Sequence, residues 1–574
     1  MKPKVLFLTF LCAFLFITVV LAIIVNPPII LSTQAEVDAL FGTEKIVGNL
    51  IITGSEITNL DKLEMLDSLK GNLTIRSTSA LTSIAGLSNL KFIGGGLTID
   101  SNSALLSING LSKIDSIRGN LTITHNTLLA NINGLTKIDS VRGSLTVANN
   151  INLTNITGLS NLSFIGGDLK LDSNYALLDM SGLSKIDSIG GNLSIKHNIQ
   201  LANINGLTKI DSVTGSITIA TNTALTKIDG LSGLTYIGGG LKIDSNYALL
   251  SMNGFSKIDS VTGGVNISVN KTLANLDGLF NLTFIGGGLK IDSNYALLSL
   301  NGLSKLNSVI GDITIHTNST LTNIDGFYNL ISVKGDINIL ENTSLSEFCG
   351  LFNLLNGDGI SGNLNISGNK IDPSKQDILD GGSCNTQDLI EDLVFSISSS
   401  NIPKGTMTSL THLLENAEKS LQKGNNGAAV NQLEAFINKL KAQDGKKIDG
   451  LSVNIWMDAS QQIIALIQTG LAKNSNGQIL TSASPKPKIF SLDQNYPNPF
   501  NPSTTIRYGL PENEKVTIDI YDILGREVAE LVNGEAAAGY HEVKFDGSKL
   551  SSGIYFYRLT AGSFTQIHKM LLLK

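Results

Sequence analysis

The sequence has few of the residues from which metal, redox and nucleic-acid sites are built. Its 574 residues include one Trp, three Cys and six His, and only 16% are charged, against roughly 25% in typical soluble domains. The formal net charge is −6, which argues against the basic face that nucleic acid requires. It contains neither a phosphate-binding loop nor a Cys-x-x-Cys pair. We therefore expect no cofactor, no metal and no nucleic-acid partner, and we expect the chain not to be an enzyme.

Residues 1–35 are typical of an export signal. Lys2 and Lys4 precede an almost wholly apolar run over residues 5–25, and Thr33-Gln34-Ala35 fits a signal-peptidase cut before Glu36. The run of about 21 residues is also long enough to cross a bilayer, so an uncleaved anchor is the alternative. We favour cleavage because the rest of the chain has the features of an extracytoplasmic protein.

Residues 48–384 consist mostly of a strict repeat. The pattern Gly-x-Leu-x-Ile returns at a constant interval, from Gly71 to Gly95 and so on as far as Gly335. A looser unit at Gly48 and a last one at Gly362 bring the total to fourteen units. We number the positions of each unit from this glycine. The apolar residues at positions 3 and 5 alternate with polar ones, which predicts a short, half-buried strand. Each unit is therefore expected to form one turn of a solenoid and to add one strand to a parallel sheet.

Two further columns of the repeat predict its corners. Position 8 is Asn in twelve units, from Asn102 to Asn369, and position 16 is Gly in twelve, from Gly86 to Gly350. We expect the Asn side chains to hydrogen-bond from turn to turn and to occupy a left-handed corner. The glycines mark a second corner where no Cβ fits. Gly and Asn occur too often for any part of the unit to be predicted as helix.

The pattern G-x-L-x-I-x-x-N-x-x-L-x-x-I-x-G-L, as in Gly119 to Leu135, resembles the receptor L-domain type of leucine-rich solenoid. The resemblance extends from about Gly48 to Cys384. It implies a right-handed parallel β-solenoid of about fourteen turns, which we place at residues 36–385, and a role in adhesion or recognition. The fold class is therefore expected to be mainly β.

Two cysteines remain beyond the signal segment. An even number in an exported chain predicts a disulfide, here between Cys349 and Cys384, which would close the last turns of the solenoid. Two free buried thiols are the alternative.

The composition changes after the solenoid. Apolar residues step at helical spacing over residues 386–473, with breaks at 424–427 and 444–445, which predicts three or four helices. The stretch AAVNQLEAFINKLKAQDGKKI (Ala428 to Ile448) resembles the helical FIMAH module of secreted bacterial proteins; a plain helical spacer is the alternative. Residues 474–489 are expected to be an extended linker.

The C-terminal segment, residues 490–574, predicts a small antiparallel, Ig-like β-sandwich. The elements NYPNPFNPSTTI, YDILGREV, SGIYFYRL and the terminal KMLLLK resemble the type A C-terminal sorting domain of the type IX secretion system. The resemblance implies export by the Sec pathway and then across the outer membrane, with the secretion machinery as partner. It also implies that the protein is either released or joined to surface lipopolysaccharide.

A longer period suggests where a ligand would bind. The segment that begins at Ile99 recurs three turns later at Leu171 and again three turns later at Ile243, with one further copy after only two turns, at Ile291. The later copies each present an acidic residue at position 6 and a tyrosine at position 9, which could form a recognition stripe for a glycan or a protein. The alternative is that block copying alone spread these residues. The candidates are Asp172, Asp244 and Asp292 with Tyr175, Tyr247 and Tyr295, and Asp100 shares position 6.

Three histidines, His125, His197 and His316, are too far apart for a metal cluster and are interpreted as surface filler. Carboxylates one turn apart, such as Asp115 and Asp139, suggest a polysaccharide-active enzyme. However, a lysine lies two residues before each of them and the pattern repeats. We therefore predict a secreted or surface-displayed binding or adhesion protein, found outside the cell or on its outer surface. A polysaccharide-active enzyme on a β-helix scaffold and a structural surface-layer protein are the alternatives.

Overall fold

A computed structural model describes the chain in two compact units, which we treat separately. The described residues are 24–25, 28–380, 386–398, 400, 402–469, 490–492, 494–495, 498–523 and 525–573. The predicted apolar segment of the signal lies almost entirely outside them. Within this described part, no helix combines the length and the apolar character needed to cross a bilayer.

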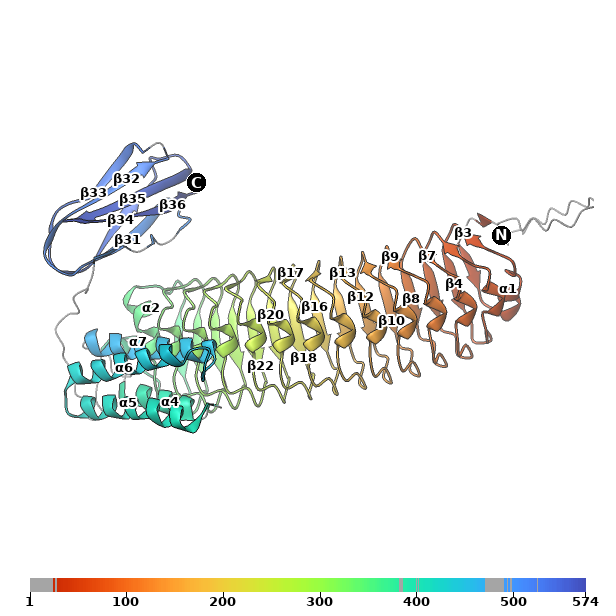
Figure 1. Cartoon of the computed structure of the whole chain (residues 1–574), viewed down its shortest axis with the longest axis horizontal. Helices are drawn as coiled ribbons and strands as arrows, with labels where there is room; N and C mark the ends of the chain where they lie inside the picture. Colours follow the sequence, from red (N-terminus) through yellow and green to blue (C-terminus); the bar gives the residue numbers. More distant parts are fainter. Residues whose placement is uncertain are drawn as a thin grey trace, which may run out of the picture. The chain divides into compact units, whose positions relative to one another are not determined.

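The solenoid contains one long sheet of 15 parallel strands, whose order in space follows the chain (Figure 1). Equivalent positions of successive turns pair in register, as Leu121 does with Leu145. The fourteen predicted units supply all but the first strand. The strands are β2 (Ile29–Leu31), β4 (Leu50–Thr53), β6 (Leu73–Arg76), β8 (Leu97–Asp100), β10 (Leu121–Thr124), β12 (Leu145–Ala148), β14 (Leu169–Asp172), β16 (Leu193–Lys196), β18 (Ile217–Ala220), β20 (Leu241–Asp244), β22 (Val265–Ser268), β24 (Leu289–Asp292), β26 (Ile313–His316), β28 (Ile337–Leu340) and β29 (Leu364–Ser367).

Each turn also adds a two-residue strand to a second parallel sheet of 14 strands, the short sheet. The repeat does not predict this sheet, because two residues are too few to show a period. Its strands are β1 (Ile24–Val25), β3 (Lys45–Ile46), β5 (Ser68–Leu69), β7 (Phe92–Ile93), β9 (Ser116–Ile117), β11 (Ser140–Val141), β13 (Phe164–Ile165), β15 (Ser188–Ile189), β17 (Ser212–Val213), β19 (Tyr236–Ile237), β21 (Ser260–Val261), β23 (Phe284–Ile285), β25 (Ser308–Val309) and β27 (Ser332–Val333).

A three-residue 3₁₀ helix links the two sheets in each turn, although no helix was predicted there. In η2 to η13, twelve of these helices, the position-16 glycine is the middle residue. A Cβ on Gly134 would come within 1.9 Å of the carbonyl oxygen of Ile108 in the preceding turn, which confirms that no side chain fits at this corner. The helices are η1 (Asp61–Leu63), η2 (Ala85–Leu87), η3 (Asn109–Leu111), η4 (Asn133–Leu135), η5 (Thr157–Leu159), η6 (Ser181–Leu183), η7 (Asn205–Leu207), η8 (Asp229–Leu231), η9 (Asn253–Phe255), η10 (Asp277–Leu279), η11 (Asn301–Leu303), η12 (Asp325–Phe327) and η13 (Cys349–Leu351).

The asparagine column runs through the core. The Oδ1 atom of Asn126 accepts hydrogen bonds from the backbone N–H and the side-chain amide of Asn102, at 3.1 and 3.0 Å. Its own amide donates to the carbonyl of Ile99 at 2.9 Å. The predicted turn-to-turn bonding is confirmed, but the predicted left-handed backbone lies one residue earlier, at position 7, where His125 has φ of 56°. The backbone N–H of Asn126 in turn donates to Oδ1 of Asn150 in the next turn at 3.1 Å.

The N-terminal end of the solenoid begins before residue 36. Strand β2 pairs with β4, and Leu31 is 3% exposed. Helix α1 (Gln34–Asp38) follows, and its N-cap residue Thr33 forms a reciprocal capping box with Glu36. At the other end, η13 is followed by helices α2 (Phe352–Asn356) and α3 (Lys375–Leu379).

The second unit contains most of the helical segment and the C-terminal domain. The helices are α4 (Thr386–Ser398), α5 (Lys404–Gln422), α6 (Asn426–Gln443) and α7 (Gly450–Thr469). Helix α5 contacts both α4 and α6. Residues 450–459 of α7 are grouped with the solenoid unit.

The C-terminal domain consists of two antiparallel sheets, as predicted. Strands β30, β31 and β34 form one sheet, and β33, β32, β35 and β36 form the other. Their apolar sides enclose one core, in which Tyr557 is fully buried. The strands are β30 (Ser491–Leu492), β31 (Ser503–Leu510), β32 (Glu514–Asp522), β33 (Glu527–Ala536), β34 (Gly539–Asp546), β35 (Gly553–Ala561) and β36 (Phe564–Leu572).

Candidate ligand-binding face

The outer face of the long sheet is formed by positions 4 and 6, because positions 3 and 5 are buried in the core. The predicted acidic residues Asp172, Asp244 and Asp292 lie at position 6, where 19%, 24% and 19% of their side chains are exposed. Each carboxylate pairs with the lysine two residues earlier on its own strand, at Nζ–Oδ2 distances of 3.4, 3.1 and 3.0 Å. Charge on this face is therefore largely neutralised within the sheet.

Histidines from the following turn approach the same row of carboxylates, a feature that was not predicted from the sequence. The histidines are too far apart to interact with one another, and their partners are instead aspartates of the preceding turn. The sequence could have revealed these pairs, because each histidine follows its aspartate by 24 or 25 residues, about one turn of the repeat. The Nδ1 atoms lie 2.9 Å from Oδ1 for His125 and Asp100, 2.9 Å for His197 and Asp172, and 3.1 Å for His316 and Asp292.

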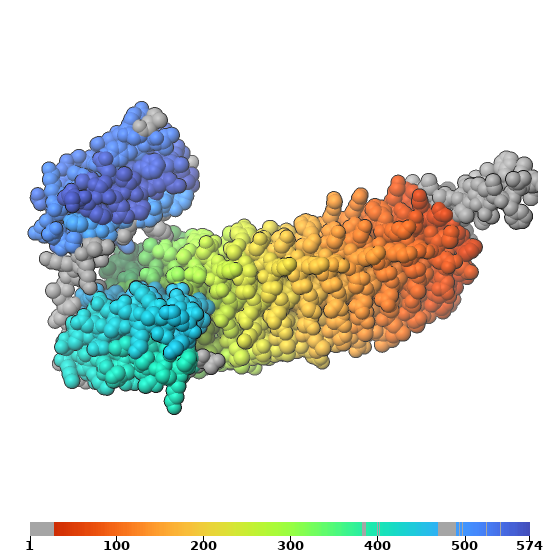
Figure 2. Space-filling model, in the orientation of Figure 1, coloured from red at the N-terminus to blue at the C-terminus, as the bar shows by residue number. Residues whose placement is uncertain are grey.

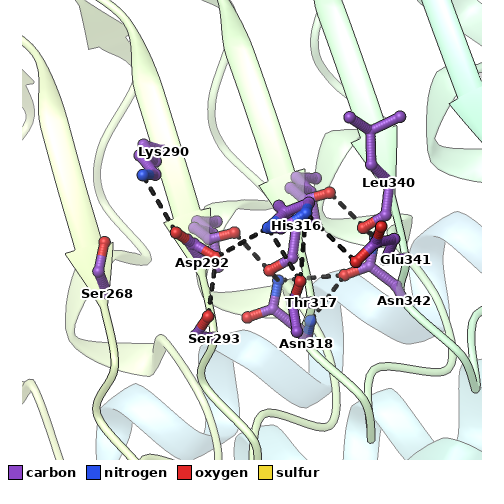
Figure 3. Close-up of polar contacts among 12 residues, drawn as sticks. Ser268, Lys290, Asp292, Ser293, His316, Thr317, Asn318, Leu340, Glu341 and Asn342 are labelled. Atoms are coloured by element: carbon purple, nitrogen blue, oxygen red, sulfur yellow. Dashed lines mark hydrogen bonds and ion pairs between the residues drawn. The ribbon is translucent and has the colours of Figure 1, made fainter.

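Figure 3 shows the best-connected of these clusters. The carboxylate of Asp292 accepts a hydrogen bond from Ser293 Oγ at 2.9 Å and pairs with Lys290 and His316. The other ring nitrogen of His316, Nε2, lies 3.6 Å from Oε2 of Glu341. His316 thus lies between carboxylates of the preceding and the following turn and links three turns of the solenoid.

These contacts lower the pKa of two of the predicted aspartates. Partial burial acts to raise the pKa of Asp172, but hydrogen bonds from His197 and Ser173 and the charge of Lys170 outweigh it and hold the pKa below 3.8. The same balance lowers the pKa of Asp292, where His316 is the strongest donor. A carboxylate kept ionised in this way is a poor general acid. Asp172 and Asp292 are therefore better suited to polar binding than to acid catalysis.

The predicted tyrosines form a separate row, past the left-handed corner at the edge of the sheet. Tyr175, Tyr247 and Tyr295 are 43%, 40% and 42% exposed. The ammonium of Lys271, at position 9 of the intervening turn, lies 4.6 Å from the ring centroid of Tyr247. In the described part of the chain, no hydrogen bond joins these tyrosines to the position-6 aspartates. The structure thus arranges the candidates in two parallel rows.

A leucine three residues after each tyrosine, at position 12, extends the second row and was also missed. Leu178, Leu250 and Leu298 are 52%, 54% and 37% exposed. The sequence did contain a sign of this row. In the recurrent SNYALL the first leucine is at core position 11, so the second leucine, at position 12, falls outside the pattern of buried positions. We call these six residues, three tyrosines and three leucines, the Tyr–Leu edge.

A shallow groove of about 590 Å³ crosses the sheet face near the last two copies. Its floor includes three consecutive position-2 glycines, Gly240, Gly264 and Gly288, and Lys242 and Lys290 line it. This position carries Asn, Ser or Asp in many other turns. The backbone therefore does not require glycine there.

The predicted disulfide lies only partly within the described residues. Cys349 is 1% exposed in η13, while Cys384 lies outside the described residues, so their pairing stays a prediction. In the part of the chain that the structure describes, no three His, Cys, Asp or Glu side chains gather in a way that could hold a metal ion.

The C-terminal domain uses its polar residues for structure. The hydroxyl of buried Tyr557 accepts a hydrogen bond from the backbone N–H of Asn495 at 2.6 Å. The guanidinium of Arg558 pairs with Asp519 at 3.1 Å and lies over the ring of Tyr521. These contacts tie the asparagine- and proline-rich opening segment and the two central strands into one domain.

Three known domain families match the chain. Residues 494–573 match the secretion system C-terminal sorting domain. Residues 43–114, 113–187 and 185–254 match the receptor L domain, and residues 386–455 match the FIMAH domain. None of the curated proteins compared with the chain matches it.

These matches confirm the three predicted resemblances. The sorting domain marks the chain for type IX secretion, to the cell surface or the extracellular space, and makes the secretion machinery its partner. Receptor L domains and a sorting domain are typical of non-catalytic secreted proteins.

Proposed function

We propose that the exported chain is an adhesion protein, displayed on the cell surface or released, which binds an extended glycan or protein along its Tyr–Leu edge. The observation that supports this proposal is the recurrence of an exposed Tyr–Leu pair along one edge of the solenoid. Successive pairs lie three and then two turns apart, or about 14 and 10 Å at the spacing of β-strands.

The chemistry of the edge suits weak, repeated contacts. A tyrosine ring offers a flat apolar surface with a hydroxyl at its rim, and the leucine adds an aliphatic contact beside it. Three such patches engaged together give avidity although each binds weakly. The adjacent row of Lys–Asp pairs supplies donors and acceptors without a large net charge. The sorting domain positions this surface outside the cell, where surface lipopolysaccharide is the proposed anchor if the protein is retained.

The test uses the purified full-length secreted protein on an array of glycans and matrix proteins. Tyr175→Ser/Tyr247→Ser/Tyr295→Ser should lower binding to the ligand so identified far more than any of the three single substitutions. Tyr236→Ser is the matched control, since this tyrosine is 48% exposed but lies on the short sheet. Circular dichroism should show the wild-type fold in every variant.

Two results would count against the proposal. Unchanged binding by the well-folded triple variant would show that the tyrosines are copied residues without a role. Self-assembly of the purified protein into a regular lattice, with no binding on the array, would favour a structural surface-layer protein instead.

A further inference from the structure

The short sheet carries a second polar surface, where the repeat is broken. Position 24 is arginine in two consecutive turns, at Arg118 and Arg142, and in no other turn of the solenoid. The segment NINGLTKIDSV before Arg142 recurs unchanged before Thr214, three turns later. Block copying therefore does not account for the arginines, since the copied sequence differs at this position. Both arginine side chains are exposed.

The register of the sheet sets the two arginines side by side. Ser116 of β9 pairs with Ser140 of β11, and each arginine follows two residues later, directly after its strand. Their backbones are about 4.8 Å apart at the usual strand spacing. Like charges directly opposite each other destabilise a sheet. The pair thus disfavours folding on its own, and a bound anion would relieve it.

A phenylalanine flanks the arginines on either side. Phe92 of β7 lies in the preceding turn and Phe164 of β13 in the following one, where it pairs with Ser140. Four successive turns therefore present Phe, Arg, Arg and Phe. In Figure 2, side chains project from the orange part of the solenoid along the edge on which Figure 1 labels β7, β9 and β13.

Contacts hold these side chains in an open arrangement. The guanidinium of Arg118 lies 5.2 Å from the ring centroid of Phe92. Arg142, Phe164, Ser140 and Gly166 line an open hollow of about 590 Å³. Phe164 is 44% exposed. Its ring edge lies over Gly166, 3.3 Å from where a Cβ on that residue would be.

Neither arginine has an ion-pair partner among the described residues. Asp115 and Asp139, which directly precede these two strands, accept hydrogen bonds from the following serines at 3.0 and 2.8 Å. The same two turns also carry Lys113 and Lys137. Against these four positive side chains stand Asp100, Asp115 and Asp139, which leaves a local charge of +1. On a chain of net charge −6, this is a local basic site.

We propose that Arg118, Arg142, Phe92 and Phe164 bind an acidic polysaccharide. The planar guanidinium groups suit the paired oxygens of carboxylate or sulfate groups, and the phenylalanine rings offer flat apolar surfaces for sugar rings. The two rings lie three turns apart, about 14 Å by strand spacing, so only an extended ligand contacts both. The site is on the short sheet and does not depend on the Tyr–Leu edge.

The first test measures binding of the full-length secreted protein to immobilised polygalacturonate, dextran sulfate and neutral dextran. The wild type should bind one or both acidic polymers, which distinguishes carboxylate from sulfate recognition, and should not bind dextran. Arg118→Ala/Arg142→Ala should weaken binding about tenfold or more. Arg76→Ala, which removes an exposed arginine from the long sheet, should leave it unchanged.

A second pair of variants tests the aromatic part. Phe164→Ser should weaken binding to the acidic polymer. Phe284→Ser should not, because this residue occupies the same position 22 at 37% exposure but has Thr262 and Ile310 at position 24 of the adjoining turns. The triple tyrosine variant should bind the acidic polymer normally, which separates this site from the Tyr–Leu edge.

The proposal is overturned if neither acidic polymer binds, or if Arg76→Ala weakens binding as much as the double variant. Equal binding of polyglutamate, which has carboxylates but no sugar rings, would also overturn it, because any acidic polymer would then suffice. Circular dichroism should confirm that each variant keeps the wild-type fold.

Discussion

The asparagine ladder offers the sharpest test of how the solenoid is stabilised. Asn222 is 0% exposed. Its Oδ1 accepts a hydrogen bond from the backbone N–H of Asn198 at 3.1 Å, and its amide donates to the carbonyl of Ile195 at 2.9 Å. In Asn222→Ala both backbone groups lose this partner in a buried site. Each such loss costs about 1–3 kcal/mol, so we expect the substitution to destabilise these turns by about 2–6 kcal/mol.

Asn161→Ala is the matched control. This asparagine also makes two side-chain hydrogen bonds, to the carbonyl of Thr136 at 2.7 Å and from Lys185 at 2.6 Å, but it is exposed. Water replaces both bonds, so the cost should stay within about 0.5 kcal/mol. Asn222→Asp separates the two roles of the amide, because the carboxylate still accepts but cannot donate. It should be at least as destabilising as the alanine variant, since it also buries a charge.

The measurement is hydrogen exchange followed by mass spectrometry, because a repeat array opens locally and need not unfold in one step. Faster exchange in the turns around residue 222 is expected for both substitutions there, together with a lower midpoint of urea unfolding. Exchange and midpoint indistinguishable from those of Asn161→Ala would refute the reasoning that these buried amides support the corners.

Export, the disulfide, acid stability and the signal cut can each be tested separately. Deleting residues 490–574 should leave the protein in the periplasm, and normal surface labelling of the truncated form would contradict the assigned route. Intact-mass analysis after alkylation without reductant should find neither Cys349 nor Cys384 modified, and two labelled thiols would end the disulfide prediction. The pKa of Asp292 is lowered below 3.8 in the folded state, so the stability that its charge contributes is present above that pH and is lost as the pH falls through the folded pKa. Asp292→Asn should therefore flatten the decline in melting temperature below about pH 4. An unchanged decline would exclude this contribution. A signal-peptidase cut before Glu36 would remove β2 and the N-cap residue of α1. N-terminal sequencing of the secreted protein should therefore find a first residue upstream of β2. A first residue at position 36 would show that the solenoid folds without this strand.

The sequence alone was sufficient for the interior of the solenoid. Positions 3, 5, 11, 14, 17, 20 and 23 are apolar in nearly every unit, and the structure buries them, as with Leu121, Ile123 and Leu129 at 0% exposure. A side chain that repeats fourteen times must meet its own copies, so its type determines whether the stack is apolar or polar. The same logic predicted the Asn ladder and the glycine corner. The C-terminal domain was equally accessible, because six of its seven strands are eight to ten residues long and some, such as β35, alternate clearly.

The sequence did not predict elements that are too short to show a period, or features that depend on contacts with a neighbouring turn. The two-residue strands and three-residue helices carry no period, and only their stacking makes them regular. The left-handed residue is His125 rather than Asn126, because the buried amide needs its own backbone N–H to face the next turn.

The surface sites belong to this second group. The contacts of Asp292 with His316, and of Arg118 with Phe92, join residues of successive turns. Parallel in-register pairing brings such residues onto neighbouring strands, about 4.8 Å apart. The amino-acid sequence determined which side chains face outward, through the alternation of each strand. Only the tertiary structure decided which outward residues meet, because that depends on the exact offset between turns and on the direction in which each long side chain leans.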